Sequence, residues 1–324
     1  MMKPEQTGQT GQTGQAEQAD KTRSVSLEEL PGLLWGELQD RHGKAFRVPH
    51  LYALVDMGRI QGELRKEVAD KLENFGYMHL LDDPKYAQLK WHSAQLVSGL
   101  KSDDAALLQE WGGCDGRIVS AWIVSKMSMP DLARHLRRAA FAYDKNNARY
   151  VLCYYDPLVT PILHRLADRD WVNWLFMPMD SWWYPVSTPM GETWSRIEGG
   201  GGSIPFQPEK PLVYSDELWE ALVSDAFPYQ ILDSVEKEHP TFFQGIDCYG
   251  VRLAKVEALL EAGRSQGLDV RDDLFAYVLG LLDEPARAGE PRWQAAVQEA
   301  TAGGALLRTY FTDREKQANE ESIK

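Results

Sequence analysis

The chain has 324 residues, with 35 Lys and Arg against 48 Asp and Glu, so its formal net charge is −13 at pH 7. This charge repels nucleic-acid phosphates and anionic lipid headgroups, and neither is expected as a partner. Hydrophobic residues make up 44% of the sequence, which is enough for a globular core that needs no metal or disulfide to hold it together.

The cysteines and the opening segment predict a cytoplasmic protein. Cys114, Cys153 and Cys248 are far apart and form no CxxC pair, which favours free, buried thiols in a reducing compartment. The first residues, MMKPEQTGQTGQTGQ, lack the apolar core of a secretory signal. No stretch of about 18 uninterrupted apolar residues is present, so the sequence predicts no membrane-spanning helix and no membrane partner.

Composition divides the chain into five parts. Residues 1–24 contain a Thr-Gly-Gln repeat and almost no apolar residue, so we expect them to be disordered. Residues 25–198 are predicted to form an α/β lobe, 199–214 a linker rich in Gly and Pro, and 215–311 a helical lobe. Residues 312–324 have the composition of a fraying polar tail.

The α/β lobe opens with a predicted strand and helix. Residues 51–56 are apolar and followed closely by a glycine, which indicates a buried strand. Gly76 is placed where it can end the following helix in the left-handed conformation. Apolar side chains recur every three or four residues along that amphipathic helix, at Ile60, Leu64, Val68, Leu72 and Phe75.

Two more strand and helix pairs follow. Residues 117–124 indicate a strand, and Ser128 with Asp131 is typical of the N-cap of a helix. Residues 150–155 indicate another strand, with a helix around residues 157–167 after it. Because strands alternate with helices, we predict an α/β lobe with a partly parallel sheet.

The pattern changes to helices alone after residue 214. Ser215 is expected to cap a helix that carries Leu218 and Leu222 on one side. Further helices are predicted at residues 249–264, 274–282 and 292–300. The sequence therefore predicts the α/β class, with an N-terminal mixed α/β lobe followed by a smaller all-helical C-terminal lobe.

The common motifs of catalysis are absent from the sequence. It contains no GxSxG, HExxH, GxxxxGK[ST] or GxGxxG motif, and no pair of histidines at helical spacing for zinc. Ser98 and Lys101 fit SxxK but lack its companion motif, and Cys153, in an apolar strand, is interpreted as an inert buried thiol. Asp168 and Asp170 are interpreted as a solvated helix end rather than metal ligands. We assign no catalytic, cofactor-binding or metal-binding residue and expect no cofactor.

Two segments stand out as binding or structural candidates. Asp156 and Pro157 stand where a helix begins, and we interpret them as a structural motif, a cap followed by proline. Trp182, Trp183 and Tyr184 end a strongly aromatic stretch. Because neighbours in a strand point to opposite faces, one Trp is expected to be buried and the other to face outward, where it can anchor a protein partner.

The order of these segments resembles the adaptor-chaperone family of type VI secretion, known as Tap or Tec adaptors, with a DUF4123-type domain. The resemblance covers about residues 48–196. It is carried by the strand at 51–56, the segment 116–125 leading into 130–136, the segment 149–157, Ile162-Leu163, and the aromatic stretch 171–183. The chain departs from the family at Cys153 and Leu158, where the family usually has arginine, so a role for those arginines is not carried over.

The resemblance implies a bacterial adaptor, not an enzyme. Such a protein binds a cognate secreted effector in the cytoplasm and helps to load it onto the VgrG spike protein. Two alternatives stay open: an enzyme of hydrolase type with a dispersed active site in the α/β lobe, and an immunity-like partner that neutralises a toxin.

Overall fold

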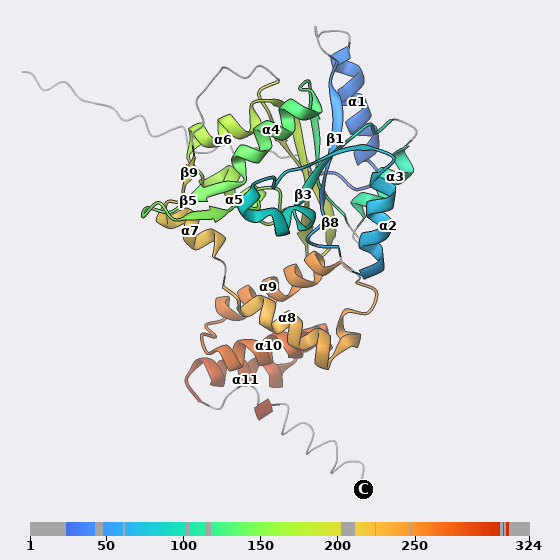
Figure 1. Cartoon of the computed structure of the whole chain (residues 1–324). Coiled ribbons are helices and arrows are strands. Elements are labelled where there is room, and N and C mark those ends of the chain that lie inside the picture. Colours follow the sequence, from blue (N-terminus) through green and yellow to red (C-terminus); the bar gives the residue numbers. More distant parts are fainter. Residues whose placement is uncertain are drawn as a thin grey trace, which may run out of the picture.

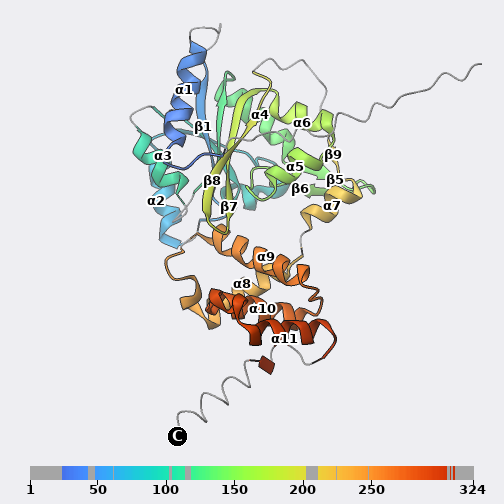
Figure 2. The same ribbon diagram turned by 180° about the vertical axis from the view of Figure 1, so that it is seen from behind.

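The computed structural model shows an α/β lobe with a smaller helical lobe beside it, below the α/β lobe in the view of Figure 1 and again in Figure 2. This arrangement confirms the predicted fold class. The residues described are 24–42, 48–60, 62–101, 104–113, 118–201, 211–223, 225–246, 248–304, 307 and 309–310. Both predicted tails, apart from Ser24, and residues 202–210 of the predicted linker lie outside this set.

The α/β lobe is built on a six-stranded sheet in the order β2-β3-β1-β4-β7-β8. Its strands are β1 (His50–Asp56), β2 (Gly76–His79), β3 (Ala94–Ser98), β4 (Val119–Ser125), β7 (Met179–Thr188) and β8 (Gly191–Glu198). Every neighbouring pair is antiparallel, so the predicted partly parallel arrangement is wrong for this sheet. The strands on either side of α2 (β1 and β2) and of α3 (β3 and β4) do run in the same direction, but one antiparallel strand lies between the members of each pair, so they do not pair with each other.

Helices cover both faces of this sheet (Figures 1 and 2). One face packs on α1 (Leu30–His42), α2 (Gly62–Leu72) and α3 (Ala105–Gly112) around a core that contains Leu34, Val68 and Trp111. The other face packs on α4 (Met129–Ala139), α5 (Thr160–Leu166) and α6 (Arg169–Phe176) around Leu136, Leu163 and Trp171. Because both faces are buried, the central strands read as continuous apolar runs.

A second, three-stranded sheet lies at the side of this lobe. It has the order β6-β5-β9, with β5 (Phe141–Tyr143), β6 (Arg149–Val151) and β9 (Leu212–Val213). The β5–β9 pair is parallel. The strand predicted at 150–155 is shorter than expected, since β6 ends at Val151. Residues 152–155 leave the sheet in a turn that buries Leu152, Tyr154 and Tyr155. The short helix η1 (Pro84–His92) lies beside this sheet, with the rings of Tyr86 and Phe141 5.7 Å apart.

The helical lobe has its own core. It contains α8 (Phe227–Glu238), η3 (Pro240–Phe243), α9 (Tyr249–Ser265), α10 (Arg271–Asp283), η4 (Pro285–Gly289) and α11 (Pro291–Thr301). Leu232, Val256, Val278 and Trp293 are buried in this core. The three helices predicted after residue 248 are present as α9, α10 and α11, whereas α8 was not predicted. No helix in the described ranges is both long and apolar enough to span a membrane.

The packing places α7 (Asp216–Leu222) with the α/β lobe. Ser215 caps this helix as expected, since its Oγ accepts a hydrogen bond from the Leu218 N–H at 3.1 Å. Leu218 is buried in the same core as α4 to α6. By its packing, α7 therefore belongs with the α/β lobe, whereas residues 215–222 were predicted to belong to the helical lobe.

Of two local expectations, one is confirmed and the other is wrong. Ser128 caps α4 as predicted, with its Oγ accepting the Asp131 N–H at 3.4 Å. Gly76, however, is the first residue of β2, and α2 already ends at Leu72. A Cβ atom at Gly76 would lie 2.9 Å from the Ser98 Oγ. This glycine therefore leaves room for the side chain of Ser98 on the neighbouring strand and does not end a helix.

The cysteines also differ from expectation. Cys153 carries a free thiol but is exposed, because β6 ends before it. Cys248 is disulfide-bonded, so the expectation of free thiols is wrong at this residue. Spacing along the chain could not reveal this, since a disulfide depends on approach through space. Cys114 lies outside the described residues.

Candidate functional site

The aromatic pair predicted as a partner anchor is buried. Trp182 and Trp183 are 1% and 2% exposed, and Tyr184 is 8% exposed. The two tryptophans do point to opposite faces of β7, because each belongs to a different core. The expectation that one faces outward is nevertheless wrong, since helices cover both faces of the sheet.

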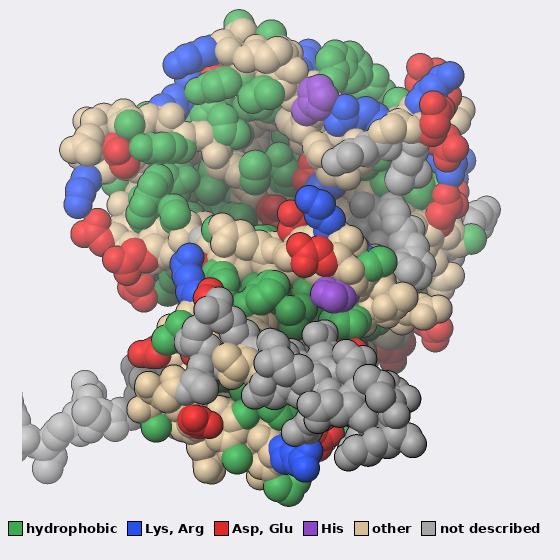
Figure 3. Space-filling view, turned by 90° about the horizontal axis from the view of Figure 1, so that it is seen from below, with side chains coloured by type: hydrophobic (Ala, Val, Ile, Leu, Met, Phe, Trp, Pro, Cys, Tyr) green, Lys and Arg blue, Asp and Glu red, His purple; other side chains and the backbone are tan. Residues whose placement is uncertain are grey.

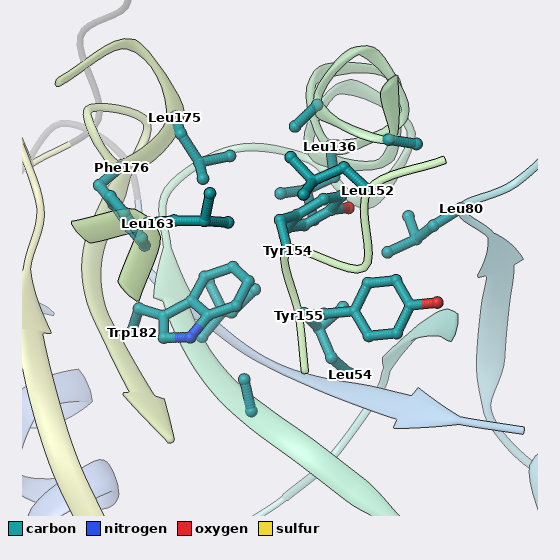
Figure 4. Close-up of a cluster of buried hydrophobic side chains, with 14 of the residues drawn as sticks. Leu54, Leu80, Leu136, Leu152, Tyr154, Tyr155, Leu163, Leu175, Phe176 and Trp182 are labelled. Carbon is teal, nitrogen blue, oxygen red and sulfur yellow. The ribbon is translucent and has the colours of Figure 1, made fainter. Parts of the chain in front are cut away.

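Trp182 lies in the interior of the α4–α6 core (Figure 4). Its ring meets that of Phe176 edge to face at 5.6 Å, and the ring of Tyr154 lies 6.3 Å away. Leu163 from α5 points into the same cluster (Figure 4). Aromatic contacts of this kind stabilise a core beyond the area that they bury. Trp182 is thus a core residue that holds β7 against α5 and α6.

Asp156 and Pro157 shape the turn before α5, but the prediction that Asp156 caps the helix is wrong, because α5 begins at Thr160 with Val159 at its N-cap. The Asp156 Oδ1 accepts the Leu158 N–H at 2.9 Å, and its main-chain carbonyl accepts the Thr160 N–H at 2.8 Å. Its carboxylate also pairs with the Arg59 guanidinium at 2.9 Å, which ties this turn to the loop after β1. Pro157 is buried. We therefore interpret both residues as structural.

Cys153 is poorly suited to nucleophilic chemistry. Its sulfur accepts a hydrogen bond from the Tyr155 hydroxyl at 3.7 Å. Displacement of water by the neighbouring groups raises the pKa of the thiol, and the carboxylates of Asp56 and Asp156 raise it further. The thiol is therefore protonated near neutral pH, whereas a nucleophilic cysteine needs the thiolate.

The carboxylates considered as metal ligands have local roles. Asp168 caps α6, with its Oδ1 accepting the N–H groups of Asp170 at 3.0 Å and Trp171 at 3.1 Å. Within the described ranges, no group of three or more His, Cys, Asp or Glu side chains is placed to hold a metal ion.

One cavity of about 440 Å³ opens in the helical lobe. Its polar lining consists of Asp225, Asp269, Arg264 and Arg271, and no histidine lines it. Both arginines lie 3.4 Å from the Asp225 carboxylate. The lining charges therefore balance.

A group of aromatic side chains that contact one another lies at the small sheet and α7. Tyr150 of β6, Tyr214 and Trp219 of α7 form an aromatic cluster. The Trp219 ring lies 5.4 Å from each tyrosine ring, and the two tyrosine rings are 6.1 Å apart. Tyr150 is 37% and Trp219 38% exposed. Three aromatic rings in contact, two of them exposed to water, are typical of interaction surfaces.

The small sheet exposes further apolar side chains. Val151 and Val213, on its two outer strands, are exposed on the face opposite to Tyr150. Figure 3 shows hydrophobic side chains around a hollow in the face seen from below, toward the side where β5 and α7 lie in Figure 1. Burial raises the pKa of Tyr214 to about 12, with further contributions from Cys153 and Tyr150. Its hydroxyl is therefore neutral and available for hydrogen bonding.

Comparison with known proteins identifies the central part of the chain. Residues 51–172 match a family model described as Domain of unknown function (DUF4123). The chain contains a DUF4123 domain. This domain is known from adaptor-chaperones of type VI secretion effectors, so the family resemblance seen in the sequence is confirmed. No curated protein and no solved structure matches the chain.

The DUF4123 match ends within α6, before the fold of the lobe is complete. Strands β7 and β8, which carry Trp182 and Trp183, lie after the match, as do β9 and α7. The aromatic cluster thus joins Tyr150 of the DUF4123 domain to Tyr214 and Trp219 outside it. A sequence signal for Trp219 exists, because it is adjacent to the buried Leu218 and points away from the apolar side of α7.

Proposed function

We propose that this chain is a cytoplasmic adaptor-chaperone that binds a type VI secretion effector and assists its loading onto the VgrG spike. The observation that supports this most strongly is the DUF4123 domain at residues 51–172. An adaptor needs surface that shields part of a client and releases it when the client docks elsewhere. It needs no catalytic residue and no cofactor.

We assign the effector contact to the aromatic cluster. Tyrosine and tryptophan dominate the energetics of protein interfaces because they bury large rigid areas and retain one polar atom for hydrogen bonding. Tyr150 and Trp219 are exposed and held in place by contact with each other. The buried Trp182, Trp183 and Tyr184 contribute indirectly, by fixing the lobe that presents this cluster.

The test is co-expression of the tagged chain with the effector encoded beside its gene, followed by affinity purification. The wild-type chain is expected to carry the effector with it. Trp219→Ala should weaken capture by about tenfold or more, since truncation of an interface hot spot costs about 2 kcal/mol. Its own free energy of unfolding should change by less than about 1 kcal/mol, because the side chain is partly solvated.

Trp91→Ala is the matched control. Trp91 is 58% exposed, lies on η1 and contacts His79 at a ring distance of 4.4 Å. This variant should capture the effector like the wild type. If both variants lose the effector, the loss does not depend on where the exposed tryptophan lies, and the aromatic cluster is not a specific contact. Full capture by Trp219→Ala would remove the aromatic cluster from the interface.

A further inference from the structure

The outer edge of β6 is an open strand edge. All three residues of β6 are exposed. Just beyond this strand, the Leu152 N–H donates to the Ala140 carbonyl at 2.9 Å. At the other end of the hairpin, the Asp144 N–H donates to the Ala148 carbonyl at 3.0 Å. These two bonds fix which backbone groups of the hairpin face inward.

In an antiparallel pair, the backbone groups of alternate residues face the partner strand. Tyr150, which lies opposite Ala142, therefore directs its N–H and C=O toward β5. Arg149 and Val151 direct theirs away from the sheet. No residue in the described ranges forms a hydrogen bond with these outward backbone groups.

At the edge strands of the large sheet, by contrast, outward backbone groups form hydrogen bonds with other parts of the chain. At β8, the Val25 N–H donates to the Trp194 carbonyl at 3.0 Å and the Trp194 N–H donates to the Val25 carbonyl at 2.7 Å. At β2, the Arg137 Nε donates to the His79 carbonyl at 2.9 Å. Covered edges are the usual protection against unwanted strand pairing. The edge of β6 lacks this protection.

The charges beside β6 indicate what kind of segment fits there. Asp144 lies 3.4 Å from the Tyr150 hydroxyl, and Asp216 and Glu217 begin α7. Lys145 reaches Asp216 at 3.3 Å, with both side chains largely in solvent. The charge of Arg149 is paired with Asp83 at 2.8 Å. The side chains around the aromatic cluster are thus mostly acidic and apolar, which favours a segment with basic and apolar side chains.

We propose that β6 binds an extended segment of the effector, carrying basic and apolar side chains, as a fourth strand of the small sheet. The outward N–H and C=O groups of Arg149 and Val151 supply the main-chain hydrogen bonds, and Tyr150 contacts the segment beside the strand. This mode of recognition is strand addition. It rests on the proposed adaptor function and specifies how the client is bound.

The experiment compares Val151→Pro with Val213→Pro in co-purification with the effector encoded beside the gene. Proline at residue 151 removes an outward N–H without breaking the pairing with β5, and capture is expected to fall about tenfold. Val213 is the control. Because Tyr214 N–H donates to the Tyr143 carbonyl at 2.9 Å, the groups of Val213 also face outward, but at the opposite edge of the same sheet. Val213→Pro is expected to retain capture.

Amide hydrogen exchange of the wild-type complex gives a second readout that does not depend on a variant folding. The amides of Arg149 and Val151 should exchange rapidly in the free chain and become protected at least about tenfold when the effector is bound. Unchanged exchange at both amides, or full capture by Val151→Pro, would overturn strand addition while the adaptor function stands. If the wild type captures no effector, both proposals are wrong.

Discussion

At the scale of single residues, His135 shows how burial links protonation to stability. It lies between α4 and α6, with its Nε2 donating to the Leu175 carbonyl at 3.0 Å and its ring 4.6 Å from that of Trp174. Burial lowers the pKa of His135 to about 4 because the imidazolium loses its hydration. The folded chain therefore binds fewer protons at this site than the unfolded chain does.

The sign of the pH effect follows from this lowered pKa. The contribution of a neutral His135 is complete above about pH 6.5 and is lost as the pH falls toward about 4, by roughly 3 kcal/mol in total. His135→Gln keeps a donor for the Leu175 carbonyl but cannot be protonated. We predict that its free energy of unfolding, measured in urea between about pH 7 and pH 4, declines less than that of the wild type. Parallel declines would contradict the assignment.

At the scale of elements, β7 joins the two cores of the α/β lobe. Trp182 pairs with Ile123 of β4 and Ile197 of β8, and its neighbour Trp183 faces the other core. We predict that Trp182→Ala and Trp183→Ala each lower the free energy of unfolding by about 3–5 kcal/mol, the usual cost of removing a buried tryptophan. Chemical denaturation measures this loss.

Met190→Ala is the control for the β7 variants. Met190 lies in the turn between β7 and β8 and is 95% exposed, so its removal should change the free energy of unfolding by less than about 0.5 kcal/mol. If a tryptophan variant proves as stable as Met190→Ala, that tryptophan is not packed as the structure shows.

Helix caps and buried strands could be predicted from the sequence, because each depends on residues that are close together in the chain. Ser128 and Ser215 cap helices as expected, and apolar runs located β1 and β4. The alternation rule also placed Trp182 and Trp183 on opposite faces. It could not show that both faces are covered, because that depends on α1 to α3 and on α4 to α6 packing from distant parts of the chain.

Features that depend on contact through space were not predicted. The antiparallel order of the large sheet follows from how connections cross it, and Gly76 is needed because Ser98 approaches from another strand. The aromatic cluster combines Tyr150 with Tyr214 and Trp219 from residues more than sixty positions later in the chain. The buried Trp182 and Trp183 drew attention instead, because adjacent tryptophans are conspicuous in a sequence.

At the scale of the whole molecule, the helical lobe contacts the sheet through the start of α9. A Cβ atom on Gly250 would clash with the Ser187 Oγ of β7. We predict that Gly250→Val pushes the start of α9 away from β7 and that the backbone amides near Ser187 exchange their hydrogens faster. Both lobes should remain folded, because each has its own core.

Gly289→Ala serves as the control for the lobe contact, since no atom lies within 4 Å of a Cβ atom placed there. Its exchange near Ser187 should equal that of the wild type. Equal exchange in Gly250→Val as well would show that α9 and β7 are not in close contact in solution.

The adaptor function itself is tested most directly by effector export from cells that lack this chain. We predict that the effector encoded beside the gene then disappears from the culture medium, that the wild-type chain restores its export, and that Trp219→Ala does not. Normal export of the effector without this chain would contradict the account.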